Sequence, residues 1–187
     1  MLWREKKIFM RSATVFSFAL AWMLISGCQS VKPIYTVETV DLKRFMGDWY
    51  VIASIPTFIE KDAYNAVESY RLDDDGTVAT TFRFNKGSFD GPLKTYTPRG
   101  FVRDPSSNAV WGMQFVWPFK AEYRIVYLTD DYSQTVIGRS KRDYVWIMAR
   151  EPSIPDEDYD RILDFLTEEG YNLDKLRRVP HAPGDGA

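Results

Sequence analysis

Short runs in which apolar and polar residues alternate recur along the chain, with turn residues between them. In the clearest run, residues 78–85, Phe82 and Phe84 alternate with Arg83. A period of two is typical of a strand with one buried face. Runs of this kind predict eight strands, at residues 49–55, 66–72, 78–85, 96–103, 109–117, 122–128, 134–139 and 144–149.

The segments between these runs carry the chemistry of tight turns. Asp73-Asp74-Asp75-Gly76 is the strongest signal, because an Asp-Gly pair supplies the positive φ angles that a hairpin needs. Connections this short favour antiparallel neighbours over parallel crossovers. An eight-strand meander can remove its two edges by closing on itself. We therefore predict an all-β fold, an antiparallel up-and-down β-barrel.

One helix follows the last predicted strand. Residues 153–155 open it, the acidic residues 156–158 suit its positive end, and Gly170 ends it. Its apolar residues recur at helical spacing and predict one stripe that packs on the outside of the sheet. The stripe consists of Tyr159, Ile162, Leu163 and Leu166.

The N-terminus has the layout of a bacterial export signal. Basic residues up to Arg11 precede an uncharged, mostly apolar run at residues 13–25, and Leu24-Ile25-Ser26-Gly27-Cys28 resembles a lipobox. In a lipobox the cysteine accepts a diacylglyceryl group before cleavage. We expect residues 1–27 to be removed and Cys28 to be lipidated. The alternatives are an ordinary secretory signal with a chance cysteine, or a single membrane-anchor helix.

Removal of that signal defines the mature domain. We expect a lipidated tether at residues 28–36, one barrel domain at 37–180 and a flexible tail at 181–187. The signal holds four basic residues and one acidic residue, so its loss changes the net charge from −2 to −5. That charge disfavours nucleic acid as a partner.

Alternation also predicts which side chains face the barrel interior. We place Arg83, Gln114 and Arg124 outside, so that the residues next to them on each strand face inward, and we place Trp49 inside. Strands two and four stay ambiguous. Burying Tyr70 on strand two also turns Glu68 inward, and placing Arg99 and Arg103 outside on strand four leaves Gly100 and Val102 inward. The predicted cavity residues are Val51, Ala53, Ile55, Phe82, Phe84, Met113, Phe115, Tyr123, Ile125 and Tyr127.

Three motifs at strand ends resemble those of the lipocalin family. Gly47-Asp48-Trp49 resembles its Gly-x-Trp motif, and Thr129-Asp130-Asp131-Tyr132 resembles its Thr-Asp-x-Tyr motif. Arg150 ends the last strand, as the third signature residue of the family does. The resemblance implies structural roles for Gly47, Trp49, Thr129, Asp130, Tyr132 and Arg150. It places Arg150 over Trp49 at the closed end of the barrel.

Finer features, including the lipobox and residues 143–152, resemble the bacterial outer-membrane lipoprotein branch of that family. This resemblance implies storage or transport of fatty acids or lysophospholipids in an apolar cavity, in outer-membrane maintenance. It also implies a lipid-anchored protein of the outer membrane, with the barrel facing the periplasm. The inward set matches a ligand pocket, which has apolar walls and a few polar groups. The alternative is a solid barrel that the aromatic residues fill.

Two other classes of function remain open. Some lipocalins are enzymes, but here the only cysteine is Cys28 and the only histidine, His181, lies near the C-terminus. We therefore expect no catalysis, no metal and no cofactor. The second class is a membrane-tethered interaction module, because Trp117, Pro118 and Phe119 can form an exposed apolar patch for a partner, the membrane or a homodimer.

Overall fold

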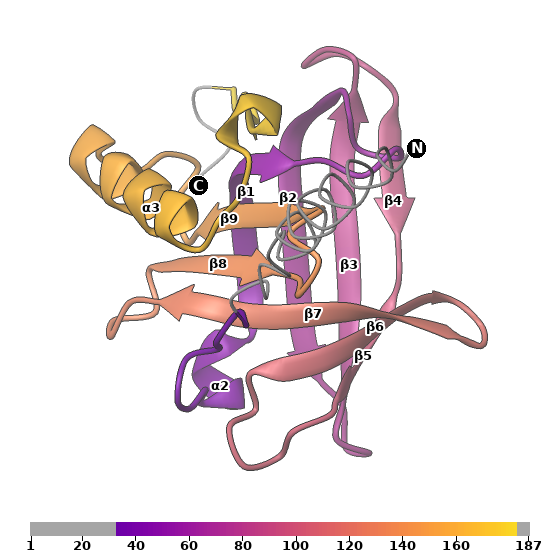
Figure 1. Cartoon of the computed structure of the whole chain (residues 1–187). Coiled ribbons are helices and arrows are strands. Elements are labelled where there is room, and N and C mark those ends of the chain that lie inside the picture. The colour runs from indigo at the N-terminus through magenta and orange to yellow at the C-terminus, as the bar shows by residue number, and fades with distance from the viewer. Residues whose placement is uncertain (1–32, 183–187) are drawn as a thin grey trace, which may run out of the picture. The chain divides into compact units, whose positions relative to one another are not determined.

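The computed structural model describes residues 33–182, which form an antiparallel β-barrel with one helix beside it (Figure 1). Cys28, the expected signal at 1–27 and residues 183–187 lie outside the described part. The helices are α2 (Leu42–Phe45), α3 (Asp156–Glu168) and the short 3-10 helix η1 (Leu173–Lys175). The strands are β1 (Gly47–Ile55), β2 (Ala63–Leu72), β3 (Thr77–Lys86), β4 (Leu93–Tyr96), β5 (Arg99–Val102), β6 (Val110–Val116), β7 (Phe119–Leu128), β8 (Gln134–Gly138), β9 (Val145–Ala149) and β10 (Arg177–Arg178).

Consecutive pairing closes the sheet on itself. The strand order is β10-β1-β2-β3-β5-β6-β7-β8-β9, with β4 also on β3, and β9 pairs back with β1 from Tyr50↔Ala149 to Ile55↔Val145. Every pairing is antiparallel, so the predicted up-and-down barrel is confirmed.

The fourth predicted strand is divided in two. β4 and β5 both pair with β3, on either side of Thr97 and Pro98. Proline has no N–H to donate to a ladder, although the Pro98 carbonyl still accepts a hydrogen bond from the Thr80 amide at 3.2 Å. The break therefore lies where the proline interrupts the pairing, inside the predicted run 96–103.

Both ends of the described segment are held more tightly than we predicted. Ile34, placed in the tether, is buried and packs in the cluster that contains α3. At the other end, the two-residue β10 pairs with β1, and the Asn65 amide donates to the Pro180 carbonyl at 2.8 Å. His181, placed in the tail, lies 2.9 Å from the Val51 carbonyl through Nε2. The barrel domain thus extends beyond the expected limits at both ends.

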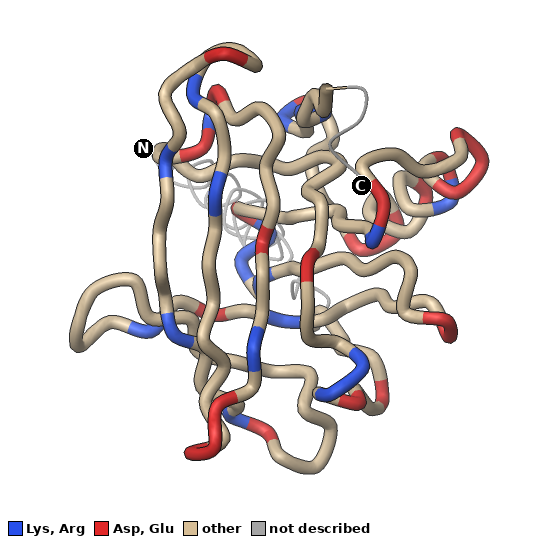
Figure 2. The backbone as a smooth tube through the Cα atoms, turned by 180° about the vertical axis from the view of Figure 1, so that it is seen from behind, with Lys and Arg blue, Asp and Glu red and all other residues tan. Residues whose placement is uncertain are grey.

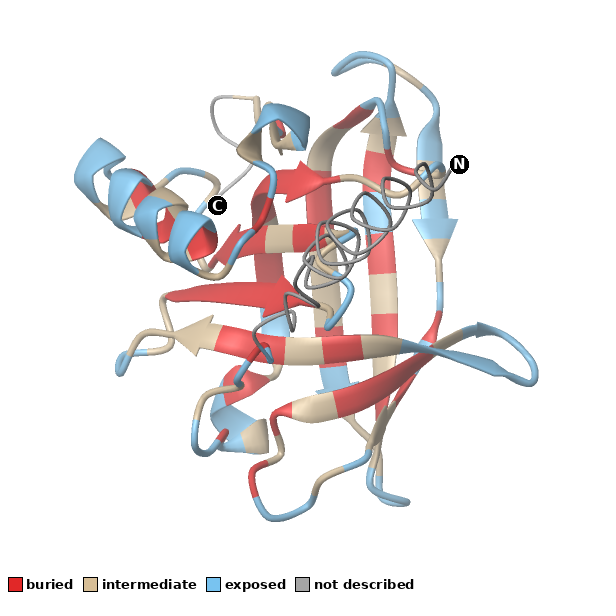
Figure 3. Ribbon diagram, in the orientation of Figure 1, coloured by how far each residue is buried: buried red, intermediate tan, exposed pale blue. Residues whose placement is uncertain are grey.

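Helix α3 packs its apolar stripe against the outside of the barrel, as predicted. Tyr159, Ile162 and Leu166 are buried, and Figure 3 shows the opposite face of the helix exposed. Gly170, at φ +82°, follows the end of the helix. Among residues 33–182, no helix is long and apolar enough to cross a bilayer.

Two β-bulges overturn part of the predicted inward face. In β1 the register with β9 shifts between Val51 and Ala53, and in β7 the register with β8 shifts between Ile125 and Tyr127. A bulge inserts one extra residue, so the faces exchange beyond it. The predictions that Ala53, Ile55 and Tyr127 face the cavity are therefore wrong, because all three pack in the outer cluster with α3.

Candidate functional site

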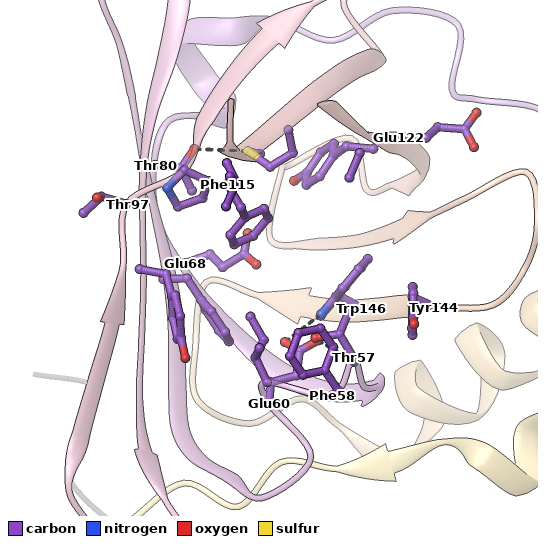
Figure 4. Close-up of a pocket in the computed structure, with 18 of the residues that line it drawn as sticks. Thr57, Phe58, Glu60, Glu68, Thr80, Thr97, Phe115, Glu122, Tyr144 and Trp146 are labelled. Atoms are coloured by element: carbon purple, nitrogen blue, oxygen red, sulfur yellow. Dashed lines mark hydrogen bonds between the residues drawn. The ribbon is translucent and has the colours of Figure 1, made fainter. Parts of the chain in front are cut away.

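One half of the barrel encloses a cavity of about 630 Å³ (Figure 4). It opens at the end that we call the mouth, where the loops 56–62, 87–92, 117–118 and 139–144 lie. Its volume lies within the range of ligand pockets, roughly 300–1,000 Å³. The wall comprises Thr57, Phe58, Ile59, Glu60, Glu68, Thr80, Phe82, Thr95, Tyr96, Thr97, Pro98, Met113, Phe115, Val116, Ala121, Glu122, Tyr123, Arg139, Tyr144 and Trp146.

The structure brings part of the predicted cavity set to this wall. Four of the predicted residues line the cavity: Phe82, Met113, Phe115 and Tyr123. Three others are buried in the inner core but do not reach the wall: Val51, Phe84 and Ile125. Strand alternation therefore identified the inner face of these strands, but it did not show at which height the barrel is hollow.

Aromatic rings fill the opposite half, which we call the closed end. Phe45, from α2, lies 5.0 Å from the ring of Trp49 and 5.6 Å from that of Trp111, between ring centroids. Trp111 in turn stacks on Tyr123 at 5.0 Å. Phe45, Trp49 and Trp111 have no exposed surface. The alternative of a solid barrel thus describes only this half.

A chain of hydroxyls ends on a carboxyl group at the inner end of the cavity. The Tyr70 hydroxyl donates to Glu68 Oε2 and lies 2.8 Å from the Tyr123 hydroxyl. Because a phenol has one proton, and Tyr70 donates its proton to Glu68, Tyr123 donates to Tyr70. The two strand-two alternatives are resolved by this geometry: Glu68 and Tyr70 both face inward.

Burial changes the proton affinity of these groups. It raises the pKa of Glu68 to about 7; the hydrogen bond from Tyr70 opposes the rise and the negative charge of Glu60 adds to it. Burial also raises the pKa of Tyr70 and of Tyr123 well above 10, and the nearby Glu68 charge adds to both shifts. The tyrosines therefore stay neutral, while Glu68 changes its charge near neutral pH.

A second acidic side chain, Glu60, comes from the loop between β1 and β2. Its Oε1 accepts a hydrogen bond from the Thr57 amide at 2.8 Å, and its Oε2 accepts one from Trp146 Nε1 at 3.2 Å. Glu60 is 4% exposed, and burial raises its pKa. The sequence reasoning missed Glu60 and Trp146. The Glu60 loop has no strand periodicity, and Trp146 was given no inward assignment.

The mouth carries exposed apolar side chains. Phe58 and Trp117 are each 82% exposed, Phe119 is 76% exposed, and Val116 is 69% exposed. The predicted patch at residues 117–119 is therefore exposed, and Phe58 is a further exposed apolar side chain, in the loop between β1 and β2. The wall also includes Arg139, which lies 3.3 Å from Asp143.

At the closed end, Arg150 connects several segments. Its guanidinium lies 3.8 Å from the ring centroid of Trp49, the contact that the resemblance implied. It also donates to the carbonyls of Asp48 and Arg44, each at 2.8 Å, and of Phe45 at 3.1 Å. Gly47 lies next to it: a Cβ there would come within 3.4 Å of Arg150 Nη1, and the φ angle is +97°.

The second motif shapes the neighbouring loop. Thr129 Oγ1 accepts hydrogen bonds from the amides of Ser133 and Gln134, at 3.1 and 3.0 Å. The Asp41 amide donates to the Tyr132 hydroxyl at 2.8 Å, and the Asp130 carbonyl accepts from Arg44 at 3.0 Å. None of the six signature residues lines the cavity. Their contacts fit the structural role that we predicted.

A model of the lipocalin-like domain matches residues 40–181. The chain belongs to the lipocalin family. It is 31% identical over 170 residues to the outer membrane lipoprotein Blc of Citrobacter freundii, covering 89% of this chain and 96% of that protein. It is 29% identical over 160 residues to temperature-induced lipocalin-1 of Arabidopsis thaliana, covering 81% of this chain and 84% of that protein.

Solved structures show the same fold at lower identity. Insecticyanin of Manduca sexta superposes with a TM-score of 0.62 at 16% identity, covering 85% of this chain and 88% of that one. The cockroach allergen Per a 4 superposes with a TM-score of 0.60 at 21% identity, covering 80% of this chain and 94% of that one. Family and cavity together identify a protein that binds hydrophobic ligands. Lipocalins are generally binding proteins rather than enzymes, and residues 33–182 contain no cluster of three metal-ligating side chains.

Proposed function

We propose that this lipocalin holds the acyl chain of a fatty acid or lysophospholipid in its cavity, for storage or transport in outer-membrane maintenance. The observation that carries the proposal is the open cavity of about 630 Å³, whose wall includes Phe82, Met113 and Phe115. Each methylene that leaves water contributes about 0.8 kcal/mol before ordering costs are deducted. A single acyl chain is a matching occupant for such a wall.

The position of the inner floor sets the expected chain-length limit. From the sequence, an acyl tail would stop near Trp49, but Trp49 does not line the cavity, whereas Glu68 and Tyr123 do. We therefore take these two side chains, which Tyr70 links through hydrogen bonds, as the inner floor. Calorimetry with saturated acids of increasing length should show affinity rising and then levelling off once the tail reaches this floor. Absence of saturable uptake of both fatty acids and lysophospholipids would contradict the proposal.

We propose further that lipidated Cys28 anchors the protein in the outer membrane, with the barrel facing the periplasm. The lipobox-like residues 24–28 support this, as do relatives named outer membrane lipoproteins. One acyl chain holds a protein on a bilayer only marginally, and two or more hold it firmly. Cys28→Ala should therefore move the folded protein to the soluble fraction. If the variant fractionates with membranes as the wild type does, lipidation is not the anchor.

The exposed apolar mouth favours a second function, that of a membrane-tethered interaction module. Trp117 and Phe119 would then contact a partner or a second copy of this chain. Figure 2 shows basic and acidic residues interspersed in that view of the barrel, which gives no support to a nucleic-acid partner. Sedimentation of the wild type and of Trp117→Ser tests for a homodimer. Calorimetry with fatty acids and lysophospholipids distinguishes a lipid carrier from an interaction module that binds no lipid.

A further inference from the structure

The charges on the cavity wall are unbalanced. Among the described residues, the wall includes three carboxyl side chains, Glu60, Glu68 and Glu122, and one basic side chain, Arg139. Glu122 is paired with Arg124 at 2.6 Å and accepts hydrogen bonds from Ser140. Arg139 lies close to Asp143. Among residues 33–182, Glu60 and Glu68 are therefore two acids on the cavity wall that form no ion pair with a basic side chain.

Glu68 also has unused hydrogen-bonding capacity. Among residues 33–182, Tyr70 is the only group that donates to it, and it does so at Oε2 alone. An ionised carboxylate accepts at both oxygens, at about four positions in all. Glu60, in contrast, already has a donor on each oxygen, Thr57 N and Trp146 Nε1. Of these two acids, Glu68 is the one that can accept another hydrogen bond from a molecule in the cavity.

We infer that Glu68 determines ligand specificity: it accepts a hydrogen bond from the ammonium or hydroxyl group of a single-chain lipid at the inner end of the cavity, and it disfavours a carboxylate or phosphate there. The inference rests on the proposed lipid-binding function and adds the chemistry of the preferred polar group. An anionic lipid must enter tail first and keep its head at the mouth, because a second buried negative charge beside Glu68 is costly.

The charge state of Glu68 gives the inference a pH dependence. The titratable groups that face it are Tyr70 on its own strand, Tyr123 on β7 and Glu60 in the loop after β1. The tyrosines stay neutral, since their pKa values lie well above 10. With the pKa of Glu68 raised to about 7, rising pH makes the inner cavity negative. A cationic ligand then gains affinity, whereas an acyl tail resting on Glu68 loses it.

Calorimetry of the full chain with decylamine, decanol and decanoate, at pH 6 and pH 8, tests this in the wild type. We expect affinity for decylamine to rise with pH and affinity for decanoate to fall. At pH 8 decylamine should bind about 10-fold or more tightly than decanoate, the size expected for a hydrogen bond to a charged group. Decanol should also bind more tightly than decanoate at pH 8. Decanoate binding as tightly as decylamine would overturn the inference.

Variants separate Glu68 from the general charge of the protein. Glu68→Gln should bring decylamine and decanoate within about threefold of each other and remove most of the pH dependence. The matched control is Glu151→Gln, which removes the same charge from an exposed position beyond β9. This control should bind decylamine more tightly than decanoate, as the wild type does. If Glu68→Gln shows the same preference, Glu68 does not determine ligand specificity. Failure of all three ligands to bind would overturn the proposed function as well, whereas equal binding would overturn only this inference.

Discussion

At the closed end, Phe45, Trp49 and Trp111 fill the space between the strands, whereas towards the mouth the corresponding space is a cavity of about 630 Å³. Both halves are built from the same alternating strands and both are rich in aromatic residues. The difference comes from what crosses each end. Helix α2 inserts Phe45 at one end, while at the other Phe58 and Trp117 extend into solvent. Aromatic content alone therefore does not distinguish a filled barrel from a hollow one.

The largest effect should come from removing a ring at the closed end. Trp49→Ala should lower the free energy of unfolding by about 3–5 kcal/mol, because it leaves a cavity in a fully buried cluster. Affinity of the folded variant for an acyl ligand should change little, since Trp49 does not line the cavity. Thermal melts with and without ligand measure both quantities.

The matched control at the mouth is Trp117→Ala. Trp117 is 82% exposed, so its removal should change stability by no more than about 0.5 kcal/mol. A Trp49→Ala protein with normal stability and lost binding would reverse the comparison between the two ends, because Trp49 would then belong to the ligand site.

Removal of Arg150 should have the next largest effect. Arg150→Ala removes the cation that lies over Trp49 and the hydrogen bonds from Arg150 to the carbonyls of Arg44 and Asp48. It also removes one of the two donors of the Phe45 carbonyl, which keeps its hydrogen bond from Trp49 Nε1. We expect a loss of about 2 kcal/mol in denaturant unfolding. Arg150→Lys keeps the charge but not the planar arrangement of donors, so its stability should lie between those of the wild type and Arg150→Ala. Equal stability of all three proteins would show that the closed end does not depend on this residue.

A charge placed in the cavity should act on binding more than on folding. Phe115 lines the cavity and is 50% exposed, so Phe115→Asp should fold and lose about 10-fold or more in affinity for dodecanoate. Phe119→Asp is the control on the neighbouring strand, because Phe119 is 76% exposed and is not part of the wall. Normal binding by a folded Phe115→Asp protein would contradict the lipid-pocket proposal.

The smallest effect concerns pH. The pKa of Glu68 is about 7 in the folded protein, above its ordinary value of 4.5. Between these values the folded state keeps a proton that the unfolded chain releases, so stability falls as pH rises from about 4.5 to 7. A shift of one pKa unit corresponds to about 1.4 kcal/mol; because water can enter the cavity, we expect about 1 kcal/mol in all.

Thermal melts from pH 4 to pH 8 check this. Glu68→Gln should flatten the dependence of stability on pH. Part of the loss of stability with rising pH should remain, because burial also raises the pKa of Glu60. Glu151→Gln should leave the pH dependence unchanged. A stability difference between wild type and Glu68→Gln that does not change across this range would contradict the raised pKa of Glu68.

The sequence by itself determined the order and kind of the elements. The alternation of Phe82 and Phe84 with Arg83, and the Asp-Gly turn at residues 75–76, specify a hairpin through contacts between near neighbours. The apolar stripe of α3 is equally local. Signals of this kind depend on periods of 2 and 3.6 residues and on turn chemistry, so a single sequence carries them.

Only the tertiary structure decided which side chains surround the cavity. The bulges after Val51 and Ile125 reversed the faces beyond them, so Ala53 and Tyr127 lie under α3. The environment of the two acids on the cavity wall depends on residues far along the chain. Glu60 accepts a hydrogen bond from Trp146, and Glu68 accepts one from Tyr70, which contacts Tyr123. Alternation fixes a side chain's face only relative to its immediate neighbours. Bulges, loop placement and buried pairing depend on partners far along the chain, and these formed the site.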